Sequence, residues 1–334
     1  MRTMYKSEVA LRKSRSTSTT VGQLERWWRH GDRLYEVLLI LATLAVLALV
    51  FGIGYELWQN SALARHQFGW QFLWTSAWDP AITKTFGALP YISGTLVTSV
   101  VGLLVAIPLG VGAAIFLAEL APAGLGRPLG YLAELLAAVP SVVYGLWGLF
   151  AFIPLFVRPV SQGLEKSLGF LPLFAGPVYG PSRLAASLVL AIMVFPTITA
   201  VSRDVLRAIP NSQREAAMAL GATRWEMIYQ VLLPYGTSGF LGAIILGLGR
   251  ALGETIAVTM VIGNNLDLTA SLLHPGYTMA SIIANEFTEA TFDLYLHALI
   301  EVGLILFVMT LLINLGARFL IWRVARRSGG EVRA

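Results

Sequence analysis

The sequence predicts an all-α polytopic membrane protein with six transmembrane helices. Of its 334 residues, 56% are apolar and only 13% are charged, about half the charged share of a typical soluble protein. Apolar runs long enough to cross a bilayer recur six times, and Lys and Arg gather in alternate segments between them. With no cysteine and four scattered histidines, a metal site is not expected.

Each apolar run is predicted to form one helix. Pro108, Pro140 and Pro196 lie inside three of the runs, and membrane helices tolerate them because neighbouring helices satisfy the freed backbone groups. The six runs cover residues 34–58, 92–120, 129–156, 184–206, 236–263 and 296–321. The predicted organisation is a basic tail that is partly disordered (1–33), a first helix (34–58), an external loop (59–91), a core of five helices (92–321) and a second basic tail (322–334).

The distribution of basic residues predicts the orientation. If the N-terminus is cytoplasmic, the inside segments hold 18 of the 24 Lys and Arg residues, the outside loops hold five, and Arg250 lies within a helix. Because basic residues favour the cytoplasmic side, both termini are expected there. The positive net charge therefore reflects topology and contact with membrane lipid, and no nucleic-acid partner is expected.

The inside segment 210–234 contains signals for two short helices. Two capping boxes start them, and these pair Ser212 with Glu215 and Thr223 with Glu226. Gly221 is predicted to end the first helix, and Pro234 follows the second. Helices this short are marginal alone, which favours docking to a partner surface. A plain amphipathic loop at the membrane interface is the alternative.

The same segment resembles the coupling motif of ABC-importer permeases. The match consists of Glu215, Ala216 and Ala217, three residues, Gly221, nine residues, and then Val231, Leu232, Leu233 and Pro234. The family more often has Ile at the position of Val231. The resemblance implies the type I ABC-importer permease fold. It also implies that a cytoplasmic ATPase dimer receives this loop, with Glu215, Ala216, Ala217, Gly221 and Pro234 as the coupling residues.

The chain is not expected to be an enzyme. A Walker A loop needs a lysine directly after a glycine to hold phosphates. None of the four lysines (Lys6, Lys13, Lys84 and Lys166) follows a glycine. ATP and Mg are therefore expected on the partner ATPase, with no cofactor on this chain.

Arg250 and Glu254 are the main candidates for substrate contact. At 1.5 Å per residue, Arg250 lies roughly 20 Å along the fifth predicted helix, too deep to snorkel easily. Charges at such depth usually face a pathway or a partner. The i,i+4 spacing allows an ion pair with Glu254, so a purely structural salt bridge is one hypothesis. An oxyanion site is the other, because the guanidinium suits bidentate binding.

Further motifs resemble the C-type permease subunit of phosphate-specific importers. They are Phe86–Ser99, Ala138–Leu149, Arg250–Thr255, Asn264–Asn265 and Ile282–Glu286. The likeness runs from about residue 70 to 322 and is absent from residues 1–33. It implies that Arg250 and Glu254 take part in phosphate passage in a bacterial inner membrane. The implied partners are a homologous second permease, the ATPase dimer and an external phosphate-binding protein.

Several features keep alternatives open. Ser141 and Tyr144 line the pathway or pack in the core. Glu119 and Glu134 are predicted to be interfacial, and Glu301 to pair within the bundle. The cargo could be another oxyanion, such as sulfate, molybdate or phosphonate, or the chain could be the sister phosphate permease. A secondary transporter or channel without an ATPase is the rival class, and the coupling motif argues against it.

Overall fold

A computed structural model describes residues 35–122 and 124–327, and the predicted tail 1–33 and most of the tail 322–334 lie outside them. The chain divides into two compact units, Met1–Glu56 and Leu57–Ala334. In the described part of the first unit, the backbone is one apolar helix that continues into the second unit as Tyr35–Asn60, with a mean hydropathy of 2.8. This helix confirms the first predicted span.

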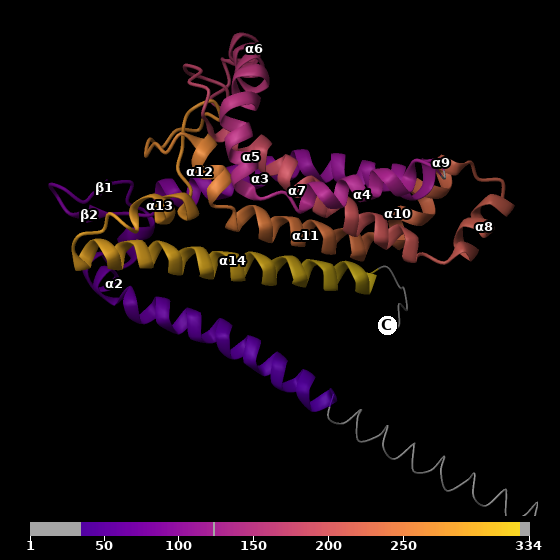
Figure 1. Ribbon diagram of the computed structural model, residues 1–334, viewed down its shortest axis with the longest axis horizontal. Coiled ribbons are helices and arrows are strands. Elements are labelled where there is room, and N and C mark those ends of the chain that lie inside the picture. Colours follow the sequence, from indigo (N-terminus) through magenta and orange to yellow (C-terminus); the bar gives the residue numbers. More distant parts are fainter. Residues whose placement is uncertain (1–34, 123, 328–334) are drawn as a thin grey trace, which may run out of the picture. The chain divides into compact units, whose positions relative to one another are not determined.

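Three long helices run through the second unit. They are α3 (Leu89–Ile115, extended to Leu120 by the π-helical turn η2, Phe116–Leu120), α7 (Arg183–Ala208) and α14 (Asp293–Arg327). α7 packs along α3 and also against α11 (Thr237–Gly253), and Figure 1 shows these helices running side by side. Pro108 and Pro196 lie inside continuous helices, as predicted.

The third predicted span, 129–156, is wrong as a single helix. Pro140 divides it into α4 (Gly126–Ala137) and a helical segment from Ser141 to Leu168 that comprises α5 (Ser141–Trp147), η3 (Gly148–Val157) and α6 (Arg158–Leu168). The backbone of Pro140 is extended (ψ 139°), and its ring has no N–H to continue α4. The membrane-crossing helix therefore lies about a dozen residues later in the chain than predicted.

The fifth predicted span, 236–263, is broken. α11 ends at Gly253, and α12 (Ile256–Ile262) begins after two non-helical residues. Before α11, a helix from Arg224 to Tyr235 meets it at a bend of 71°. Within the described residues, five helices are long and apolar enough to cross a membrane, or six if this bent pair counts as one span. The larger number agrees with the six predicted spans.

One end of the bundle is closed by a small aromatic layer. It contains α2 (Ala62–Phe68), the short 3-10 helix η1 (Gly69–Leu73), the two-stranded sheet β1 (Trp78–Asp79) and β2 (Thr85–Phe86), and α13 (Met279–Glu286). Trp78, Phe86 and Tyr91 pack edge to face in its core. The predicted loop 59–91 is thus largely ordered.

The opposite end carries a helical protrusion. It consists of α8 (Asn211–Ala219), α9 (Arg224–Met227), the π-helical turn η4 (Ile228–Leu232) and α10 (Leu233–Tyr235). Figure 1 shows α8 beyond the ends of α3 and α7, at the far end of the bundle from α13. The segment singled out from sequence therefore stands apart from the long helices.

Candidate functional site

The protrusion begins differently from the prediction. Pro210 is the N-cap of α8, and no side chain caps this helix. Ser212 lies inside the helix as its second residue, so the predicted capping box of Ser212 and Glu215 is wrong. The extended ψ of Pro210 (140°) starts the helix two residues earlier, and Ser212 is left without a free amide to cap.

Gly221 ends α8 as predicted. Its φ is +86°, in the left-handed region that favours glycine. The N–H of Gly221 donates to Met218 O at 3.0 Å, and the N–H of Ala222 donates to Ala217 O at 3.1 Å, the pattern of a Schellman motif. A Cβ on Gly221 would meet nothing within 4 Å, so the demand on this residue is conformational.

The second capping box is confirmed. The N–H of Thr223 donates to Glu226 Oε2 at 2.8 Å, and the N–H of Glu226 donates to Thr223 Oγ1 at 3.3 Å. The helix then continues through η4 to Tyr235, so Pro234 lies within the helical segment and does not follow it. Pro234 is exposed, directly before the bend that leads into α11.

The protrusion exposes apolar side chains on its outer surface. Leu220 is 89% exposed, and Met218, Trp225 and Tyr229 are also exposed. Glu215 and Ala216 share this exposure. Ala217 is buried among residues at the ends of α3 and α7, so it attaches α8 to the bundle. Clustered exposed apolar groups mark interaction surfaces, and the surface here is available for a partner.

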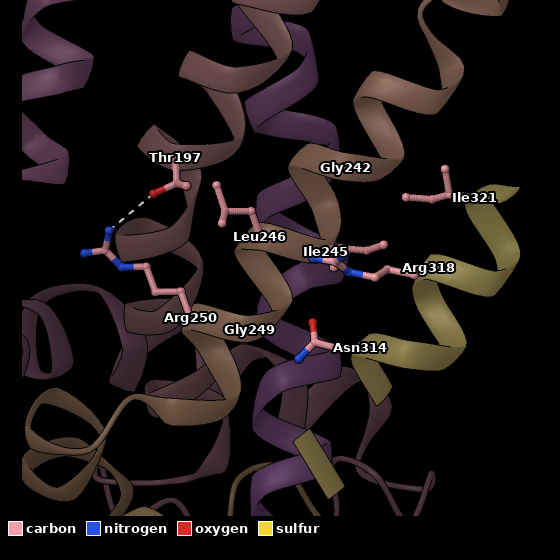
Figure 2. A pocket seen from close by; sticks show the side chains of 9 residues that line it. All are labelled: Thr197, Gly242, Ile245, Leu246, Gly249, Arg250, Asn314, Arg318 and Ile321. Carbon is pink, nitrogen blue, oxygen red and sulfur yellow. Dashed lines mark hydrogen bonds between the residues drawn. The ribbon is translucent and has the colours of Figure 1, made fainter. Parts of the chain in front are cut away.

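A cavity of about 730 Å³ lies between α7, α11 and α14 (Figure 2). It is lined by Thr197, Gly242, Ile245, Leu246, Gly249, Arg250, Asn314, Arg318 and Ile321. Figure 2 shows Arg318 directed from α14 toward α11, and Arg250 directed from α11 toward α7. The lining thus combines apolar side chains with two arginines, whose planar guanidinium groups are suited to hydrogen-bond an oxyanion.

Arg250 does not pair with Glu254. Its Nη1 donates to Thr197 Oγ1 at 3.3 Å, and no ion pair links it to a carboxylate among the described residues. Glu254 has left the helix with an extended backbone (ψ 122°), and its Oε1 accepts the N–H of Ala257 in the first turn of α12 at 3.2 Å. The i,i+4 contact was predicted for a continuous helix, and the break after Gly253 removes it.

Ser141 and Tyr144 do not line this cavity. Tyr144 is 7% exposed and packs with α12, and its hydroxyl donates to Leu136 O at 2.8 Å. This placement favours the core-packing hypothesis for Tyr144. Ser141 is the half-buried first residue of α5.

Several residues of the site were not predicted. Thr197, Asn314 and Arg318 line the cavity from α7 and α14. Glu119 and Glu134, predicted to be interfacial, form ion pairs with Arg214 and Arg203 at 2.7 and 2.8 Å. Glu301 forms an ion pair with Arg65 at 3.7 Å, as a pairing was predicted, but Arg65 belongs to α2 and not to a long helix of the bundle. These partners are distant in sequence, so no local spacing reveals them.

Comparisons with known proteins agree with this architecture. Residues 106–328 match the family described as "Binding-protein-dependent transport system inner membrane component". The phosphate transport system permease protein PstC of Mesorhizobium japonicum is 44% identical over 303 residues, which cover 89% of this chain and 92% of that protein. The protein of the same name from Pasteurella multocida is 45% identical over 311 residues, which cover 92% and 94%.

Solved structures resemble the chain in fold. A chain of the bacterial alginate ABC transporter, in complex with an alginate pentasaccharide-bound periplasmic protein, aligns with a TM-score of 0.58 at 18% identity. The alignment covers 89% of this chain and 97% of that chain. The long helices are therefore arranged as in permeases of ABC transporters.

Proposed function

Because the chain belongs to the family of binding-protein-dependent transport system inner membrane components, we propose that it is the permease subunit of an ATP-driven importer of inorganic phosphate. It is a multi-pass membrane protein of the type I ABC-importer permease fold. Its identities of 44% and 45% with phosphate transport system permeases, over most of each chain, support the substrate. A homologous second permease supplies the other half of the pathway.

The observation that carries the oxyanion site is the environment of Arg250. Its guanidinium lies about 20 Å along α11 from Thr237, beside a cavity, and its hydrogen-bond partner is a neutral hydroxyl. An arginine in a membrane is costly unless an anion or carboxylate meets it. A phosphate in transit supplies that charge and can accept two parallel hydrogen bonds. Glu254, which holds the start of α12, shapes the backbone beside this site.

The protrusion around α8 is proposed to dock on the ATPase dimer. Its exposed apolar surface and its Gly221 bend suit insertion into a groove, with Glu215, Ala216, Gly221 and Pro234 near the contact. ATP and Mg are bound by the ATPase and not by this chain. In this arrangement both termini are cytoplasmic, the protein lies in a bacterial inner membrane, and an external phosphate-binding protein delivers the substrate to the opposite end.

The test is transport by the assembled complex in proteoliposomes. Labelled phosphate, loaded on the binding protein, should accumulate only when ATP and Mg reach the ATPase. Unlabelled phosphate should compete, whereas sulfate, molybdate and phosphonate should not. Competition by one of those anions alone would reassign the substrate. Uptake that is independent of ATP would instead identify a secondary transporter or channel and contradict the proposal.

A further inference from the structure

Arg214 points from α8 back toward the bundle, although most of α8 is exposed. Its Nη2 donates to Glu119 Oε1 at 2.7 Å, and its Nε donates to Glu119 Oε2 at 3.2 Å. The side chains of Arg214 and Glu119 are only 19% and 9% exposed. Glu119 belongs to η2 at the end of α3. This bidentate pair therefore connects the protrusion to α3 in a site that is largely shielded from solvent.

The same guanidinium also holds the end of α7. Its Nη1 donates to Ile209 O and its Nη2 donates to Leu206 O, both at 2.7 Å. These carbonyls lie at the C-terminal end of α7, where Leu206 O also accepts the N–H of the C-cap residue Ile209 at 3.3 Å and the helix supplies few further amide donors. One planar side chain thus fixes α8 against two transmembrane helices at once. The rigid fork of arginine holds such a geometry, and a flexible ammonium does not.

Apart from its covalent connection to α7 through Ile209 and Pro210, the remaining attachment of α8 to the bundle is slight. Among the residues of α8, Ala217 is the buried one, and a single methyl group in an apolar contact resists sliding poorly. A bidentate ion pair resists both separation and lateral shift. Arg214 is therefore the firmest non-covalent connection from α8 to the bundle among its described contacts, and its bond to Glu119 reaches α3, to which the chain does not join α8 directly.

α7 carries this connection to the transport cavity. Thr197, the hydrogen-bond partner of Arg250, lies on α7 nine residues before Leu206, about 13 Å along a continuous helix. A displacement of α8 is thus transmitted through Arg214 to the helix that holds Arg250.

We propose that Arg214, paired with Glu119, is the positioning residue that converts movement of the docked α8 into movement of α3 and α7. This inference rests on the proposed function, because it assumes that α8 receives the ATPase. It adds the residue through which ATP hydrolysis is coupled to the cavity.

The chain offers a matched control. Arg203 Nη2 donates to Glu134 Oε1 at 2.8 Å and joins α7 to α4 at the same end of the bundle. This pair has no hydrogen bond or ion pair with α8 among the described residues. Glu134→Gln therefore weakens a more exposed ion pair at the same end of the bundle without touching the contact between Arg214 and Glu119.

The experiment measures phosphate uptake and ATP hydrolysis together, in proteoliposomes that hold the whole complex. Arg214→Gln should leave the ATPase bound but reduce the phosphate imported per ATP by about tenfold. Arg214→Lys keeps the charge without the fork and should give an intermediate ratio. Glu134→Gln should leave the ratio unchanged. Exchange of the charges, Arg214→Glu with Glu119→Arg, should restore part of the ratio, because the ion pair returns without the bonds to α7.

The outcomes separate the two proposals. If Arg214→Gln lowers uptake and hydrolysis equally, in proportion to complex abundance, Arg214 is only a structural contact and the inference is overturned. If Arg214→Gln changes neither phosphate uptake nor ATP hydrolysis, the inference is overturned as well. If the wild-type complex shows no ATP-dependent phosphate uptake, the proposed function itself fails.

Discussion

Arg250 Nη1 donates a hydrogen bond of 3.3 Å to Thr197 Oγ1, which links α11 to α7 through a charged donor and a neutral acceptor. The carboxylate of Glu254, four residues later, is turned away to the amide of Ala257. The positive charge beside the cavity is therefore not neutralised by its neighbour in sequence, and it is available to an anion.

Arg250→Gln should lower phosphate uptake at least roughly 30-fold, because loss of a buried charged contact costs about 2 kcal/mol or more. Arg250→Lys keeps the charge and loses the fork, so it should retain part of the activity. Uptake should be compared at equal complex abundance. Arg323→Gln, an exposed change near the end of α14, is the control and should transport normally.

The double variant Arg250→Gln with Glu254→Gln should remain inactive. In a structural ion pair, removal of both partners would relieve the unpaired charge and restore function. The two side chains do not meet, so no such rescue is expected. Normal uptake by the double variant would show that Arg250 is not a substrate contact.

Gly242→Leu should block transport without preventing assembly. Gly242 lines the cavity, and a Cβ there would meet nothing within 4 Å, so the larger side chain can enter open space without a clash. Uptake should fall while ATPase copurification stays unchanged. Leu246→Ala at the same wall enlarges the cavity, so it serves as the control and should not block phosphate uptake. Full transport by Gly242→Leu would place the pathway elsewhere.

Gly221→Val should weaken docking of the ATPase. A β-branched residue at φ +86° costs about 1–2 kcal/mol, and the Schellman turn after α8 should open. Because a Cβ there meets no neighbour, membrane insertion should be unaffected. The measurement is the yield of ATPase that copurifies with the permease. Wild-type yield from this variant would contradict the docking role of the protrusion.

The orientation can be tested by cysteine labelling, since the chain contains no cysteine. Ser76→Cys and Ala270→Cys are exposed at the end that is proposed to be external, and an impermeant reagent should label them in intact cells. Ser212→Cys, exposed on α8, should react only after permeabilisation. Labelling of the α8 position from outside would reverse the proposed topology.

The features that the sequence predicted correctly depend on neighbours within a few residues. The capping box of Thr223 and Glu226 and the left-handed Gly221 belong to this class. The prediction of one helix through Pro140 failed because a proline can either lie within a membrane helix or end one. The residues around it do not decide between these two outcomes. Pro108 and Pro196 show the first outcome and Pro140 the second.

Other features depend on the tertiary fold. The segment from Thr237 to Ile262 contains no proline, and Gly253, where α11 ends, is one of five glycines in it, so the sequence did not single out this break. The hydrogen bond from Arg214 to Glu119 joins residues 95 positions apart. Contacts of this kind are set by how α3 and α7 pack, which hydropathy and spacing do not encode.

The central position of α7 has a consequence for biogenesis. Of its most apolar stretch, 67% is buried inside the protein, compared with 33% for α3 and 22% for α14. During synthesis α3 precedes α7, whereas its other packing partners α11 and α12 follow it, so one face of α7 is exposed to lipid until they are inserted. Two hydroxyl groups of α7 are already hydrogen-bonded within the helix during this time, because Ser187 donates to Arg183 O and Thr199 donates to Phe195 O. These two hydroxyl groups therefore need no partner from lipid, and later helices can pack against them without having to supply a hydrogen-bond acceptor.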